Sequence, residues 1–124
     1  ALVFMHHPPF ITGMGAMDEP FEGADLLRDV LSRAPWARLC CGHMHRPIFT
    51  AWAQGLALTV PSISMQIDLD LSPQGGDTFR MEMPGYMLHH WDGSHLNSHV
   101  CQIPADVDFS GPHPFADSVN PVED

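Results

Sequence analysis

The sequence predicts a strand-rich α/β fold with one main helix. Residues 1–5 and residues 37–41 are largely apolar, and each run leads into histidines followed by proline. Short apolar runs of this kind are typical of strands in a sheet that is covered on both faces. Between them, apolar residues recur at helical spacing and predict a helix over residues 22–33. A strand, a helix and a strand in this order form a βαβ unit, so we expect two parallel strands that end at the same edge.

Further strands follow this unit. Residues 48–53 and 56–60 are apolar, and we expect them to form a β-hairpin with its turn at Gln54-Gly55. Residues 63–69 alternate between apolar and polar side chains, which predicts a strand with one exposed face.

The carboxyl-terminal part of the chain predicts one more strand pair. Residues 83–91 and 95–103 flank an Asp-Gly dipeptide at 92–93, a strong turn signal. The next residues are rich in Pro, Asp and Ser and show no periodicity. We therefore expect a domain over residues 1–104 and an irregular tail over residues 105–124.

Composition excludes some classes of partner. The chain has 124 residues, and its formal net charge of −10 argues against a nucleic acid polymer or an anionic membrane surface as partner. No apolar run reaches the length of a membrane span. Cys40, Cys41 and Cys101 show no disulfide pattern, so we expect reduced thiols, typical of the cytoplasm. The sequence leaves self-association into a homo-oligomer open.

Histidines follow both strands of the predicted βαβ unit. His6 and His7 follow the first strand, and His43 and His45 follow the second. Because side chains alternate along an extended chain, we expect the rings of His43 and His45 to face the same side. Imidazoles that meet at one edge are ligands for first-row metals, although a polar surface turn would also explain them. Asp18 is the acid nearest in sequence to these histidines.

Several motifs resemble the calcineurin-like metallophosphoesterases, and among them the bacterial cyclic-nucleotide and glycerophosphodiester phosphodiesterases. The motifs are His-His-Pro-Pro at residues 6–9, Met-Asp at 17–18, Cys-Gly-His-Met-His-Arg at 41–46 and Val-Pro-Ser at 60–62. The resemblance implies an α/β/β/α sandwich, of which this chain would be the carboxyl-terminal half.

The resemblance also implies a dinuclear metal centre of two divalent ions (Mn, Fe, Zn or Co). His6 and His43 would bind the second ion, and His45 would bind the first. His7 would orient a metal ligand or contact the substrate. Alternatively, His7 would bind the ion in place of His6. Arg46 would bind phosphate, cap the turn or pair with an acid.

The remaining metal-binding motifs of that family lie before its His-His-Pro-Pro motif, and they do not occur in this sequence. The resemblance therefore implies a missing amino-terminal half and a chain that is inactive alone. In the complete enzyme, the implied reaction is metal-assisted hydrolysis of a small phosphodiester, either a 3',5'-cyclic nucleotide or a glycerophosphodiester. Two other hypotheses stay open: a mononuclear histidine module without catalysis, and a structural or oligomerising fragment. We assign no role to the five histidines beyond residue 88.

Overall fold

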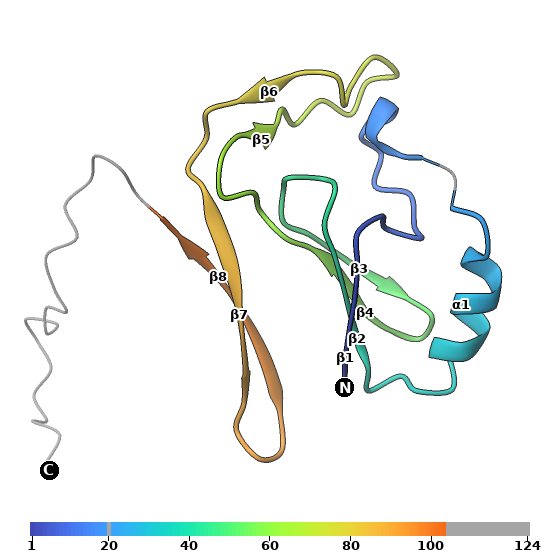
Figure 1. Ribbon diagram of the computed structural model, residues 1–124. Coiled ribbons are helices and arrows are strands. Elements are labelled where there is room, and N and C mark those ends of the chain that lie inside the picture. Colours follow the sequence, from blue (N-terminus) through green and yellow to red (C-terminus); the bar gives the residue numbers. More distant parts are fainter. Residues whose placement is uncertain (20, 104–124) are drawn as a thin grey trace, which may run out of the picture.

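The computed structural model describes residues 1–19 and 21–103 (Figure 1). The predicted irregular tail and His113 lie outside the described residues. Within the described part, no helix is both long and apolar enough to cross a membrane.

A four-stranded sheet forms the centre of the molecule. Its strands are β1 (Leu2–Met5), β2 (Arg38–Cys41), β3 (Ile48–Trp52) and β4 (Gly55–Thr59), arranged in the order β1-β2-β4-β3. β1, β2 and β4 run parallel to one another, while β3 is antiparallel to β4. Helix α1 (Ala24–Leu31) connects β1 to β2, so the predicted βαβ unit is confirmed.

The outer edges of this sheet are β1 and β3. Among the described residues, β1 pairs with β2 alone, and Phe4 in its middle is 68% exposed. The backbone groups on the other side of β1 therefore have no strand partner in the described part of the chain.

The predicted hairpin is present, but its turn lies one residue earlier than expected. Ala53 and Gln54 occupy the turn with φ of 51° and 62°, and Gly55 already pairs with Trp52 as the first residue of β4. Two successive residues with positive φ are the signature of a type I′ turn. A glycine is needed in the strand because a Cβ on Gly55 would lie 3.0 Å from the carbonyl oxygen of Pro35.

The strand predicted over residues 63–69 is mostly absent. Only β5 (Gln66–Ile67) is extended, paired with β6 (Phe79–Arg80), and both ends of the predicted strand are exposed. The buried Gln66 side chain accepts a hydrogen bond from the Ser62 amide and donates one to the Ser62 carbonyl. These bonds close a local turn over residues 62–66, which explains why the alternating pattern does not produce a long strand.

The last two strands are confirmed as an antiparallel pair. β7 (Gly85–Trp91) and β8 (Leu96–Gln102) pair along their whole length, with His89 opposite Ser98. The hairpin lies beside the central sheet, on the face opposite α1 (Figure 1).

A small polar network connects this hairpin to the central sheet. Nη1 of Arg38 donates to Oγ of Ser98 at 2.6 Å, and that hydroxyl lies 2.7 Å from Nδ1 of His89. The other ring nitrogen of His89, Nε2, lies 3.7 Å from Sγ of Cys40. Burial lowers the pKa of His89, and the Arg38 charge lowers it further, so this ring is neutral at neutral pH.

Two apolar clusters stabilise the fold. The larger cluster is buried between the sheet and α1, and the smaller one lies beneath the loop that contains the short 3₁₀ helix η1 (Gly15–Met17). The buried residues of the larger cluster are Leu39, Cys41 and Ala57, and those of the smaller cluster are Met14, Met44 and Ile67.

The helix is less buried than its amphipathic pattern predicts. Leu31 packs against the larger cluster, but Leu26 and Val30 are 73% and 60% exposed. Trp36, between α1 and β2, is 71% exposed. Leu26 and Val30 stay exposed because the apolar stripe reaches the cluster only near the carboxyl end of α1.

The cysteines are free thiols, as predicted. Cys40 and Cys41 are each 2% exposed, whereas Cys101 is half-buried. Burial, followed by the neighbouring Cys40, raises the pKa of Cys41 to about 12. Cys41 is therefore protonated at neutral pH and acts as a small apolar side chain.

We expect iodoacetamide at pH 8 to modify Cys101 well before Cys40 or Cys41. The thiolate is the reactive form, and the raised pKa of Cys41 keeps that form scarce until the pH approaches 12. Timed quenching and peptide mass spectrometry measure the order of labelling, and a sample in denaturant should label all three thiols. Labelling of native Cys41 as fast as Cys101 would contradict its burial.

The Arg38–Ser98–His89 network gives a second prediction. Ser98→Ala should lower the free energy of unfolding by about 1 kcal/mol, since it removes the hydroxyl that both neighbours bond. Asn97→Ala is the control, because Asn97 is exposed on the same strand. Denaturant unfolding measures both variants, and equal effects of the two would show that the network contributes no stability of its own.

Candidate metal centre

The register of two parallel strands places the two histidine motifs together. Met5, the last residue of β1, lies opposite Cys41, the last residue of β2. His6 and Gly42 therefore leave the sheet side by side at its carboxyl edge. In open α/β sheets this edge is where ligands bind.

Gly42 allows the His6 ring to lie against the second strand. Its amide donates hydrogen bonds to the carbonyls of Met5 at 3.2 Å and His6 at 2.9 Å. A Cβ on Gly42 would lie 3.2 Å from Nδ1 of His6, a distance tighter than most Cβ contacts. A larger residue at this position would thus displace the imidazole.

Three imidazoles gather at this edge. One ring nitrogen from each of His6, His7 and His43 lies within 4.8 Å of the others. The His43 ring centroid is 5.4 Å from that of His6 and 4.2 Å from that of His7. His6 is exposed, while His7 and His43 are partly buried, so the group is open on one side. Three convergent imidazole nitrogens are a chemically suitable ligand set for a first-row divalent metal.

The state of His43 fits such a role. Its Nε2 is buried and has no hydrogen-bond partner among the described residues. Burial lowers the pKa of His43, and the neighbouring His7 and His6 rings lower it further, although Glu19 acts in the opposite direction. A histidine must be neutral to bind a metal, so these causes favour the ligating form.

The acid nearest in sequence has a structural role in the described part of the chain. Both carboxylate oxygens of Asp18 accept hydrogen bonds, from the amides of Thr12, Gly13 and Met14 and from the Thr12 hydroxyl. These four bonds close the loop that carries η1. In this structure, the Asp18 carboxylate therefore stabilises the loop.

Glu19 is an acid that reaches the histidines, and its role was not predicted from the sequence. Its Oε2 lies 3.0 Å from Nε2 of His7. A carboxylate beside one ring nitrogen favours a proton on that nitrogen and leaves the other as the acceptor. No motif distinguishes Glu19 from other surface acids, so only its spatial position identifies it.

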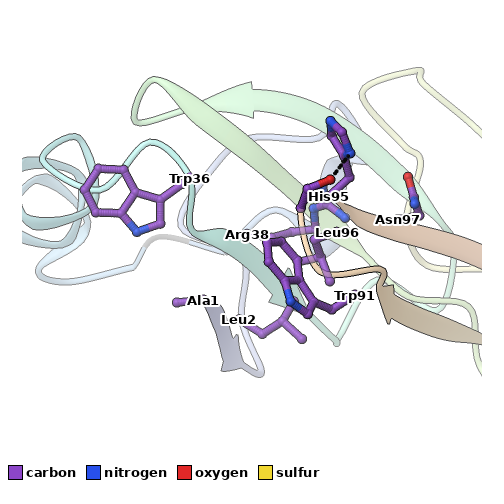
Figure 2. Close-up of a pocket in the computed structure, with 9 residues that line it drawn as sticks. Ala1, Leu2, Trp36, Arg38, Trp91, His95, Leu96 and Asn97 are labelled. Atoms are coloured by element: carbon purple, nitrogen blue, oxygen red, sulfur yellow. Dashed lines mark hydrogen bonds between the residues drawn. The ribbon is translucent and has the colours of Figure 1, made fainter.

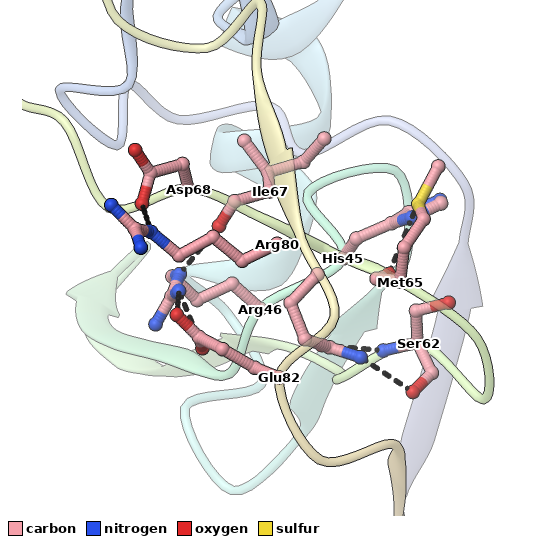
Figure 3. A network of polar contacts seen from close by, with 9 residues as sticks. His45, Arg46, Ser62, Met65, Ile67, Asp68, Arg80 and Glu82 are labelled. Carbon is pink, nitrogen blue, oxygen red and sulfur yellow. Dashed lines mark hydrogen bonds and ion pairs between the residues drawn. The ribbon is translucent and has the colours of Figure 1, made fainter.

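His45 does not join the three-histidine group. Its Nδ1 lies 3.2 Å from the carbonyl oxygen of Met65 and 3.3 Å from the sulfur of the same residue (Figure 3). His43 and His45 have positive φ values of 67° and 48°, so the alternation of an extended strand does not apply to them. The extended backbone from which we expected both rings to face one side is therefore absent here.

Arg46 is engaged with an acid and a backbone carbonyl. Its Nη2 donates to both carboxylate oxygens of Glu82 at 2.9 and 2.8 Å, and its Nε donates to the Ile67 carbonyl at 3.0 Å. We expected Arg46 to bind phosphate, to cap the turn or to pair with an acid. Its bonds to Glu82 are a pairing with an acid.

A cavity of about 600 Å³, which His95 helps to line, lies at the other end of the sheet from His6 and His43 (Figure 2). It is bordered by Leu2 and Arg38, the first residues of β1 and β2, and by Trp36 and Trp91. The cavity is therefore at the amino ends of the parallel strands, opposite the edge that carries His6 and His43.

Comparison with known proteins places these features in context. No protein-family model matches the chain. A probable glycerophosphodiester phosphodiesterase of Arcobacter nitrofigilis is 37% identical over 92% of this chain and 42% of its own length. A probable cyclic nucleotide phosphodiesterase of Rhodopseudomonas palustris is 31% identical over 82% of this chain and 38% of its own length.

A third relative, a glycerophosphodiester phosphodiesterase of Enterobacter lignolyticus, is 31% identical over 73% of this chain. The chain spans between 33% and 42% of the length of these three curated relatives. Their names agree with the expectation drawn from the histidine motifs. Over this part of their length, the chain is similar in sequence to these glycerophosphodiester and cyclic nucleotide phosphodiesterases.

Proposed function

We propose that this chain contributes to the metal-dependent hydrolysis of a small phosphodiester, either a 3',5'-cyclic nucleotide or a glycerophosphodiester. The observation that carries the proposal is the convergence of His6, His7 and His43, whose ring nitrogens lie within 4.8 Å of one another. The names of the relatives support a phosphodiester as the substrate class.

The activity belongs, in this proposal, to an enzyme longer than this chain. The chain covers 42% of the length of its Arcobacter relative. A dinuclear centre also needs a carboxylate that bridges the two ions. In the described residues Asp18 is committed to its loop and Glu19 contacts His7, so we assign the bridging carboxylate to the remainder of the enzyme.

The proposed overall architecture is an α/β/β/α sandwich. Two features of the described part support it: α1 lies on one side of the central sheet, with Leu31 packed against the apolar cluster, and the β7–β8 hairpin lies on the other side. The Arg38–Ser98 hydrogen bond and the edge-to-face contact of the Phe4 and His89 rings join the two strand layers.

We assign to the histidines the ligand roles that the sequence motifs imply. His6 and His43 hold the second ion in this proposal, and His45 holds the first. The Met65 carbonyl beside Nδ1 of His45 favours a proton there, which leaves Nε2 as the metal-binding nitrogen. His7 either orients a neighbouring ligand or binds the ion itself, since its ring is part of the same group.

The bound cations (Mn, Fe, Zn or Co) would supply Lewis-acid activation of water and neutralise charge on the phosphoryl oxygens. The protein residues prepare the site for them. His43 is kept neutral by burial and by its histidine neighbours. Glu19 holds the His7 ring by its Nε2 nitrogen.

One observation favours a second candidate function. His6, His7 and His43 form a single group within this chain alone, while His45 lies apart from it. A group of three imidazoles is sufficient for a mononuclear site, as in a non-catalytic metal-binding module. The two candidates differ in stoichiometry, because the module holds one ion and the complete phosphodiesterase holds two.

A metal titration tests the proposal. The metal-free chain should bind Co²⁺ or Zn²⁺, and His43→Ala should weaken that binding by more than about tenfold, because it removes a ligand. His90→Ala is the matched control, since it removes an exposed imidazole on β7. Calorimetry gives the affinity, and elemental analysis of the complete enzyme gives the number of ions.

Activity of the complete enzyme provides the second measurement. The rates at which the wild-type enzyme and its His43→Ala variant hydrolyse a cyclic nucleotide and a glycerophosphodiester should be compared. His90→Ala serves as the control in both assays. A chain that binds neither metal, or an enzyme that keeps full activity without the His43 imidazole, would refute the proposed function.

A further inference from the structure

The turn that carries His43 and His45 has an unfavourable backbone conformation. Both residues lie in the left-handed region, with φ of 67° and 48°. Residues other than glycine rarely adopt this region, and they keep it only where the surrounding contacts impose it. The contacts that hold this turn therefore decide where the two imidazoles lie.

Strand β5 and the residue before it hold the carboxyl-terminal half of the turn. The Met65 carbonyl faces Nδ1 of His45, and the Ile67 carbonyl accepts a hydrogen bond from Nε of Arg46. Met44, between the two histidines, is fully buried in the cluster that contains Ile67. Met44, His45 and Arg46 thus all contact the short segment of residues 65–67.

Glu82 secures this arrangement from the other side (Figure 3). Both of its carboxylate oxygens accept from Nη2 of Arg46, whose side chain is only 16% exposed. The Arg46 carbonyl, in turn, accepts a hydrogen bond of 2.5 Å from the Thr59 hydroxyl at the end of β4. Hydrogen bonds between charged groups are stronger than neutral ones, and they are less screened where the pair is partly buried.

We propose that Arg46 and Glu82 form a positioning pair that sets the orientation of the His43 and His45 rings for metal binding. This inference rests on the proposed function, because it concerns the same site. The guanidinium is occupied by Glu82 and Ile67, so Arg46 acts through the turn and makes no direct contact with substrate. Loss of the pair would let the strained turn relax and move the rings.

A neighbouring ion pair provides a matched control. Asp68 accepts a hydrogen bond from Nε of Arg80, next to the Arg46–Glu82 pair (Figure 3). This second pair joins the residue after β5 to β6, and in the described part of the chain it makes no hydrogen bond or ion pair with residues 42–46. Asp68→Asn therefore perturbs the same region without releasing the turn.

The test compares Glu82→Gln with Asp68→Asn. We expect Glu82→Gln to raise the dissociation constant for Co²⁺ by about tenfold, the scale found for residues that orient metal ligands. Asp68→Asn should leave that constant unchanged. Arg46→Lys keeps the charge but loses the Nε–H donor, so its affinity should lie between those of the wild type and Glu82→Gln.

Two further readouts separate positioning from simple stabilisation. In the metal-free chain, the NMR signals of the His43 and His45 rings should shift in Glu82→Gln and remain in place in Asp68→Asn. Combining Arg46→Gln with Glu82→Gln should weaken binding no more than Arg46→Gln alone, because one interaction is lost in both cases.

Equal effects of Glu82→Gln and Asp68→Asn, additive losses in the double variant, or unshifted histidine signals would each overturn the positioning role. A wild-type chain and enzyme that bind no metal would refute the proposed function instead. The NMR comparison would still decide whether the pair orients the two rings.

Discussion

The candidate site depends on the parallel pairing of β1 with β2. Their register sets Met5 opposite Cys41, and the Gly42 amide extends the alignment by bonding the carbonyls of Met5 and His6. A shift of one residue would turn every side chain of a strand to the other face of the sheet. The separation of the first and second histidine motifs is thus determined by backbone hydrogen bonds, independently of any bound ion.

Much of this arrangement could be predicted from local sequence, because the signals involved act over a few residues. The apolar runs that end near proline gave β1 and β2 correctly, and the Asp-Gly dipeptide at 92–93 marks the turn between β7 and β8. The meeting of His6 with His43 followed from one general rule, that a helix between two neighbouring strands makes them parallel.

The remaining features depend on distant contacts, which no local pattern encodes. Glu82 lies 36 residues from Arg46, and the left-handed backbone of His43 and His45 is imposed by the segments that surround the turn. The alternation over residues 63–69 was misleading because the Gln66 side chain bonds the backbone of Ser62. An amphipathic pattern shows which face of α1 is apolar, but it does not show which other residues cover that face. The exposure of Leu26 therefore could not be predicted from the pattern.

The open side of β1 has a consequence for handling the molecule. In the described part of the chain, the outer amide and carbonyl groups of this edge strand have no strand partner, and Phe4 at its centre is exposed. Such an edge is a template for adding a strand from another polypeptide. Concentrated solutions of the isolated chain are thus expected to form intermolecular β-structure, and solubilising changes are best placed at this strand, away from the histidines.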